Sequence, residues 1–242
     1  KDGVDINADE FYHRLTTGKI LPKTSAPSPG DMAAAYSGLS KESREIVSIH
    51  ISSKLSATHS SALLGKEQAG KDYRIEVVDS QQASMGLGLL AIGAARRAAA
   101  GATSYDIKDW VFHAIPKTHL FGLVDTLEYM QKGGRIGKAQ AFLGSLLQIK
   151  PIISVKDGEV HPVERVRSRK KGLERLVELT TAFKTVQFLA LFNSTNDEAI
   201  EEVAQRLGKA FPGVEIYRSR FGPVIGTYVG PGAVGVALIE KD

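Results

Sequence analysis

Short apolar runs bounded by turn residues alternate in this chain with longer runs that repeat an apolar residue every three or four positions. The first pattern is typical of buried strands and the second of helices. The apolar runs predict strands over residues 46–51, 74–79, 118–124, 151–155, 159–163, 186–192, 214–218 and 234–239. The helical pattern predicts helices over residues 9–15, 57–68, 85–100, 105–114, 126–132, 139–147, 169–184 and 197–210. We therefore expect an α/β protein.

Two short sequences predict where particular elements begin or turn. Ser28, followed by Pro29 and by Asp31, has the pattern of an N-cap, a first-turn proline and a capping-box acid, and it predicts a further helix from residue 29. The pair Asp157-Gly158 between two apolar runs predicts a β-hairpin.

The order of the predicted elements changes near Pro116. Before this residue strands and helices alternate, which favours a parallel sheet with helices on both faces. After it, a hairpin and crossovers occur together, which favours a mixed sheet with helices on one face. We expect two α/β domains, residues 1–116 and 117–242.

Composition narrows the classes of protein and site. The chain contains no cysteine, which excludes disulfides, thiolate catalysis and cysteine-ligated metal, and we expect a cytoplasmic protein. No apolar run approaches the ~18 residues of a membrane span, and the charged N-terminal segment is unlike a signal peptide. The six histidines lack the spacing of metal ligands, so no metal is expected. The net charge of +4 is too small to indicate nucleic acid by itself.

Hydroxyl side chains gather where a strand leads into a helix. Residues 48–62 contain seven of them, and Ser56 is expected at the N-cap of helix 57–68. Free N–H groups and the helix dipole at that end favour an anion such as a carboxylate. From the residues alone, Ser56 either caps its own helix or holds an anionic group. Thr24, in a loop with prolines, is either a plain loop residue or a second hydroxyl for the same group. Supporting candidates are Ser25, Ser52 and Ser53.

Motifs for catalysis and nucleotide binding are incomplete. No Gly-x-Ser-x-Gly elbow occurs, and no carboxylate lies near His50 or His59 in the sequence to orient an imidazole, which argues against a serine hydrolase. Residues 86–91 look like a dinucleotide fingerprint, but they begin seven residues beyond the strand end at Asp79. Close helix packing by small residues explains them better.

Two groups of cations have more than one interpretation. The segment Lys132-Gly-Gly-Arg-Ile-Gly-Lys138 is either a helix end with solvated charges or a cationic turn whose Arg135 approaches a carboxylate or a phosphate. Residues 165–171 carry five cations without interleaved aromatic side chains. This pattern favours a solvated face or a docking patch for an acidic partner over a nucleic-acid surface.

Seven motifs in a fixed order resemble those of the DegV family of bacterial fatty-acid-binding proteins, and the resemblance covers essentially the whole chain. The motifs are Thr24-Ser-Ala-Pro-Ser-Pro-Gly30, Ser48-Ile-His-Ile-Ser-Ser-Lys-Leu-Ser-Ala-Thr58, Val78-Asp-Ser80, Leu127-Glu-Tyr-Met-Gln-Lys-Gly-Gly-Arg-Ile-Gly137, Ile149-Lys-Pro-Ile-Ile153, Arg167-Ser-Arg-Lys-Lys171 and Gly222-Pro-Val-Ile-Gly-Thr-Tyr-Val-Gly-Pro-Gly232.

The resemblance implies a two-domain DegV-like fold with a long-chain fatty acid, such as palmitate, buried between the domains. It implies that hydroxyls hold the carboxylate, with Thr24, Ser56 and Ser25 as ligand residues and Arg135 and Tyr228 beside them. It also implies a carrier without catalytic residues or cofactor. Some members are the binding subunit of a fatty acid kinase and present the carboxylate to an ATP-using partner, which makes the acyl phosphate.

The apolar wall of such a site is expected to come from Phe142, Leu143, Leu146, Leu147, Ile149 and Ile152. Two alternatives stay open. One is a serine-dependent lipid hydrolase that uses Ser56. The other is a ligand-responsive nucleic-acid-binding regulator that uses residues 165–171.

The chain departs from the family pattern in two places. Family members usually begin with a strand and an Asp-Ser loop ahead of the point where this chain starts, so we expect a truncated first sheet. The Gly-Thr-His-Val of many members is Gly226-Thr-Tyr-Val229 here. Tyr228 would then donate a hydrogen bond where those members have an imidazole.

Overall fold

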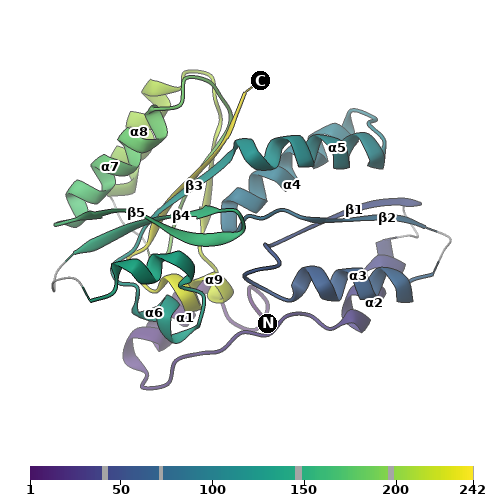
Figure 1. Cartoon of the computed structure of the whole chain (residues 1–242), viewed down its shortest axis with the longest axis horizontal. Helices are drawn as coiled ribbons and strands as arrows, with labels where there is room; N and C mark the ends of the chain where they lie inside the picture. The colour runs from purple at the N-terminus through teal and green to yellow at the C-terminus, as the bar shows by residue number, and fades with distance from the viewer. Residues whose placement is uncertain (40–42, 71–72, 145–148, 196–198, 242) are drawn as a thin grey trace. The chain divides into compact units, whose positions relative to one another are not determined.

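Figure 1 shows the computed structural model, which describes residues 1–39, 43–70, 73–144, 149–195 and 199–241. Contacts divide the chain into two compact units. Unit 1 comprises Lys1–Thr24, His119–Lys156 and Val160–Asp242, and unit 2 comprises Ser25–Thr118 and Asp157–Glu159. The chain has a small parallel sheet and a mixed six-stranded sheet, so the predicted α/β class is confirmed.

The sheet of unit 2 pairs β1 (Glu45–His50) with β2 (Arg74–Asp79) in parallel, and Ile46 lies opposite Ile75. In Figure 1, α4 (Ser84–Ala99) and α5 (Ser104–Ala114) lie on one side of these strands, and α2 (Pro29–Leu39) and α3 (Thr58–Gln68) lie on the other. One turn of 3₁₀-helix, Ile115–Lys117, follows α5. The predicted parallel sheet with helices on both faces is therefore confirmed.

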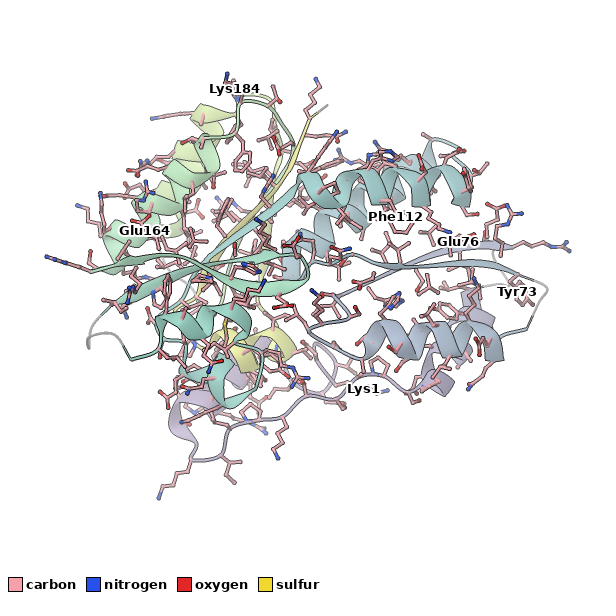
Figure 2. All side chains as sticks on the ribbon, in the orientation of Figure 1. Lys1, Tyr73, Glu76, Phe112, Glu164 and Lys184 are labelled. Atoms are coloured by element: carbon pink, nitrogen blue, oxygen red, sulfur yellow. The ribbon has the colours of Figure 1, made fainter. Side chains whose placement is uncertain are left out.

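Contacts between side chains and small residues hold the helices of unit 2 in place. Glu76 of β2, labelled in Figure 2, pairs with Lys108 of α5 at 2.6 Å. A Cβ at Gly93 of α4 would lie 2.1 Å from the Trp110 ring of α5, so only glycine permits this approach. Residues 86–91 lie inside α4 rather than in a strand-to-helix turn. Close packing, and not a dinucleotide fingerprint, explains these small residues, as the sequence predicts.

The start of α2 is the capping box that the sequence predicts. The Ser28 Oγ atom accepts the N–H of Asp31 at 3.1 Å, and the Asp31 carboxylate accepts the N–H of Ser28 at 3.0 Å. Two N–H groups that the helix itself cannot satisfy thereby gain partners.

We expect Ser28→Ala to lower the free energy of unfolding by about 1 kcal/mol, because the hydroxyl that accepts the Asp31 N–H is lost. Urea denaturation followed by circular dichroism measures this change. Ser60→Ala, at an exposed position in α3, is the control and should leave the midpoint unchanged. Equal midpoints for both variants would show that the cap contributes nothing.

The sheet of unit 1 has the strand order β5-β4-β3-β8-β6-β7. Its strands are β3 (Thr118–Leu123), β4 (Lys150–Lys156), β5 (Glu159–Val166), β6 (Val186–Asn193), β7 (Ile216–Arg220) and β8 (Val234–Glu240). Strand β6 pairs in parallel with β7 and antiparallel with β8, while β3 and β4 are antiparallel. Positive φ angles of 52° at Asp157 and 78° at Gly158 form the turn between β4 and β5. The predicted hairpin and mixed sheet are confirmed.

The main core of unit 1 lies between this sheet and two helices, α7 (Arg169–Thr181) and α8 (Ala199–Ala210). Side chains from strands and helices are fully buried there, namely Leu123, Ile152, Leu176, Leu189, Leu207, Val234, Val236 and Leu238. The remaining helical elements of unit 1 are α1 (Ala8–Thr17), α6 (Glu128–Lys132), the 3₁₀-helix η2 (Gly137–Phe142) and α9 (Pro223–Val229).

The predicted set of elements needs two corrections. The helix expected over residues 139–147 is wrong, because only the short 3₁₀-helix η2 forms. Leu143 is extended (φ −71°, ψ 149°) and Gly144 has a φ of 82°, so the helix cannot continue, and residues 145–148 lie outside the described part of the chain. Helix α9 was not predicted, because its seven residues are too few to show a helical repeat.

The contact units differ from the expected domain limits in two segments. Residues 1–24 belong to unit 1 and residues 157–159 to unit 2, although the sequence grouped them with the N-terminal and the C-terminal domain, respectively. For residues 1–24 the reason is the packing of α1, which contacts α9 through Phe11 and Tyr12. Such a contact between distant segments leaves no trace in the local sequence. The division into domains at residue 116 otherwise stays a prediction.

Candidate functional site

A cavity of about 290 Å³ in unit 1 brings together three of the residues singled out in the sequence, Thr24, Arg135 and Tyr228. Lys23 and Lys132 also line it, so three cations face one small space. Lys132 forms an ion pair with Glu128 one helical turn away. An anionic group is the ligand that such a lining favours.

The polar centre of this cavity is a pair of hydroxyls. The Oγ1 atom of Thr24 and the phenolic oxygen of Tyr228 form a hydrogen bond, and both side chains are half-buried. The guanidinium carbon of Arg135 lies 5.4 Å from the centre of the Tyr228 ring. An ionised carboxylate only accepts hydrogen bonds, whereas a hydroxyl can donate one, so this pair can bind a carboxylate. Among the described residues that line the cavity there is no histidine or carboxylate side chain that could activate either hydroxyl as a nucleophile.

The position of Tyr228 follows from how α9 begins and packs. Pro223 suits the first turn of a helix, and the Asp2 carboxylate accepts the N–H of Val224 at 3.0 Å. A Cβ at Gly226 would lie 2.7 Å from the Phe11 ring, so only glycine lets α9 approach α1 this closely. Gly230, the C-cap of α9, has a φ of 70°, a backbone conformation that favours glycine.

The other two predicted ligand residues, Ser25 and Ser56, belong to unit 2. Ser25 is exposed. Ser56 is half-buried, but the expectation that it forms the N-cap of its helix is wrong, because α3 begins at Thr58 and Ala57 occupies the cap. The Ser56 hydroxyl instead lies 2.8 Å from that of Thr58 and accepts the Thr58 N–H at 3.3 Å. Ser56 therefore accepts one of the free N–H groups at the start of α3, although it lies one residue before the N-cap.

The loop that carries Ser56 is anchored by its neighbours. Ser52 is fully buried and donates a hydrogen bond to the carbonyl of Gly158 at 2.7 Å. Lys54 pairs with Glu159 at 3.1 Å. Ser52 is thus a structural residue of this loop, which the sequence had proposed only as a supporting ligand.

The structure places a serine beside a histidine in unit 2, but this serine is Ser48. Its hydroxyl lies 2.7 Å from the Nε2 atom of His50 and 2.9 Å from the Tyr36 hydroxyl. Burial and the neighbouring His59 lower the pKa of His50, and Asp79 opposes them. The described contacts of Ser56 include no histidine, so the geometry does not support Ser56 as an activated nucleophile.

The cations of residues 165–171 are largely engaged by other groups of unit 1. The Arg165 guanidinium lies 4.9 Å from the centre of the Phe142 ring. Arg169 donates to a backbone carbonyl and faces Asp125 at 3.8 Å, and Lys171 pairs with Glu174 at 3.3 Å.

The proposed apolar wall needs one correction. Ile152 lies in the core between the sheet and α7, so it cannot also line a ligand site. Phe142, Leu143 and Ile149 are half-buried, and Leu146 and Leu147 lie outside the described residues. Another hollow of about 680 Å³ in unit 2 is lined by the small side chains of α4, such as Ala94 and Ala98.

The part of the chain that the structure describes contains no cluster of three histidine or acidic side chains that could hold a metal ion. None of the helices in that part is long and apolar enough to span a bilayer. Sequence reasoning had not assigned Lys23 or Tyr129 to the site. Lys23 stands next to Thr24 and could have been included, whereas Tyr129 looks like an ordinary residue of an amphipathic turn.

Comparison with known proteins identifies the family. The family model described as "Uncharacterised protein, DegV family" matches residues 1–241. A DegV domain-containing protein of Caldanaerobacter subterraneus subsp. tengcongensis is 34% identical over 244 residues, covering 100% of this chain and 86% of that protein. Among solved structures, a DegV family protein from Thermus thermophilus, described by its fatty acid binding, has a TM-score of 0.92 at 32% identity and covers 99% of this chain and 86% of that one.

A stearic acid-binding protein from Eubacterium ventriosum has a TM-score of 0.90 at 25% identity, with 99% of this chain and 85% of that one covered. The fold that these structures share therefore extends over both units of the present chain. Because the family model spans all but the last residue and a relative of full overlap exceeds 30% identity, the chain belongs to the DegV family.

Proposed function

We propose that this protein binds a long-chain fatty acid and holds its carboxylate at the cavity of unit 1. The hydrogen-bonded hydroxyls of Thr24 and Tyr228, beside the Arg135 guanidinium, are the observation that carries the proposal. One hydroxyl can donate to the carboxylate while it accepts from the other, and the cation offsets the negative charge. The fatty acids bound by the related structures support the same class of ligand.

The acyl chain would supply most of the affinity. Burial of a methylene group contributes about 0.8 kcal/mol, so the ~14 methylenes of a palmitoyl chain give a gross driving force of ~11 kcal/mol. The polar groups then need only satisfy the carboxylate and fix its position. Ser56 and Ser25 of unit 2 are proposed as further hydroxyls for the ligand, and their contribution is tested by substitution to alanine.

Titration calorimetry of the delipidated protein tests this function. We expect stearate to bind with one site per chain and stearyl alcohol, which has the same tail, to bind more weakly. Equal affinity for both would contradict a role of the cavity in carboxylate binding. Failure of both to bind would contradict the function altogether.

We further propose that the protein is a carrier without catalytic activity of its own and presents the carboxylate to a partner kinase. ATP and Mg²⁺ would then be bound by the partner, and both proteins would work in the cytoplasm, where ATP is available. The cations of residues 165–171 suit an acidic surface on that partner. The protein alone, given ATP, Mg²⁺ and stearate, should form no acyl phosphate, and addition of the kinase subunit should produce it. Acyl phosphate formed without the partner would refute the carrier role.

A further inference from the structure

We propose that Gly133 is a positioning residue for the carboxylate site, because it seats the Tyr228 ring and anchors the Arg135 side chain. The inference rests on the proposed function, since it concerns the hydroxyl that is to meet the carboxylate of the ligand.

The backbone of Gly133 does not itself require glycine. This residue follows α6 as its C-cap with φ −80° and ψ −9°, a conformation open to every L-amino acid. The neighbouring Gly134 is different, because its φ of 72° favours glycine and a Cβ there would meet nothing within 4 Å. Glycine is therefore favoured at the two adjacent positions for different reasons. At Gly134 the reason is the backbone conformation, and at Gly133 it is a neighbouring side chain.

That neighbour is the ring of Tyr228. A Cβ at Gly133 would lie 2.6 Å from both the Cδ1 and the Cε1 atom of this ring and 3.1 Å from the carbonyl oxygen of Tyr129. Contacts at 2.6 Å do not occur between real atoms of this kind, so an added methyl group would displace the ring.

The location of the ring decides where the hydroxyl lies. Since a phenol is rigid, displacement of its Cδ1–Cε1 edge also moves the oxygen that bonds to Thr24. The carbonyl of Gly133 accepts a hydrogen bond from the Arg135 Nη1 atom at 3.0 Å, and the guanidinium carbon lies 5.4 Å from the Tyr228 ring centre. Gly133 thus contacts two of the three polar side chains that are to meet the carboxylate, Tyr228 and Arg135.

Gly133→Ala tests this inference on the delipidated protein. We expect the dissociation constant for stearate to rise about tenfold, the loss of one hydrogen bond to a charged group. The affinity for stearyl alcohol should stay the same, because this ligand has no carboxylate that depends on the position of the Tyr228 hydroxyl. Gly208→Ala in α8, where the nearest atom would lie 4.0 Å from the new Cβ, is the matched control and should change neither ligand.

A second background shows whether the effect passes through the hydroxyl. In a protein that already carries Tyr228→Phe, the further change Gly133→Ala should alter stearate binding by no more than about twofold. A tenfold loss in both backgrounds would overturn the inference, because the phenolic oxygen would then have no part in it.

The outcomes separate this inference from the proposed function. If the unmodified protein fails to bind stearate, the function is wrong. If the unmodified protein binds stearate and Gly133→Ala binds it equally well, or loses both ligands equally, only the positioning role is wrong. Should Gly133→Ala not fold, the double variant with Tyr228→Ala removes the ring and should fold. If it does not, the contact with the Tyr129 carbonyl is responsible and the inference fails.

Discussion

Replacing Thr24 by valine and Tyr228 by phenylalanine together should weaken stearate binding by roughly 100-fold, equivalent to about 3 kcal/mol. Both substitutions keep the size of the side chain and remove only the hydroxyl. The carboxylate would then lose hydrogen bonding to the hydroxyl pair, while the Arg135 guanidinium would still line the cavity. Calorimetry gives the affinity, and thermal unfolding shows whether the fold is unchanged.

The control for this pair lies in the ligand as well as in the chain. Stearyl alcohol should bind the double variant about as well as it binds the unmodified protein, since the acyl tail keeps its contacts. The losses of binding free energy in the two single variants should not add up to the loss in the double variant, because the two hydroxyls bond to each other. An unchanged affinity for stearate would show that the hydroxyl pair does not bind the carboxylate.

The second large effect concerns the fold that supports α9. A Cβ at Gly235 of β8 would lie 2.3 Å from the ring of Phe192, its partner on β6, which is only 1% exposed. We expect Gly235→Ala to lower the free energy of unfolding by about 2 kcal/mol, because the ring cannot move without disturbing a packed core. Urea denaturation measures the change.

The same substitution should reach the ligand site at a distance. Phe192 packs edge-to-face on Phe221, with ring centres 5.0 Å apart, and Phe221 lies two residues before the start of α9 at Pro223. Stearate binding to the folded part of the sample should therefore weaken by a few-fold. Gly208→Ala, which adds the same methyl group where there is room for it, should affect neither stability nor binding adversely. Equal stability of the two variants would show that the core accommodates the extra atom.

Local patterns predicted most of the fold. The capping box at Ser28, the turn at Asp157-Gly158 and the apolar runs of the strands each depend on residues close together in the chain. The two elements that were predicted wrongly or missed do not follow from such local patterns. The helix expected over residues 139–147 had enough apolar residues, but only the 3₁₀-helix η2 forms and the backbone turns at Gly144. Helix α9 was missed because its seven residues are too few to show a helical repeat.

Local patterns alone predicted only the residue types of the candidate site, whereas the family motifs singled out Thr24, Arg135 and Tyr228, which line one cavity. The hydroxyls and the cationic turn pointed to an anion, but from the residues alone Thr24 could equally have been a plain loop residue. The hydrogen bond between Thr24 and Tyr228 joins positions 204 residues apart, and no local pattern contains it. The role proposed for Gly133 could not be predicted from the sequence either, because a glycine that follows a helix is usually explained by its helix-terminating role alone.

Carbon-13 NMR of stearate labelled at its carboxyl carbon is the most direct test that hydroxyl groups of unit 1 hold the acid group. We expect one bound resonance, distinct from that of free stearate, that shifts when Thr24→Val or Tyr228→Phe is introduced and keeps its position in Gly208→Ala. A bound resonance that stays in place in both hydroxyl variants would mean that the carboxylate lies elsewhere.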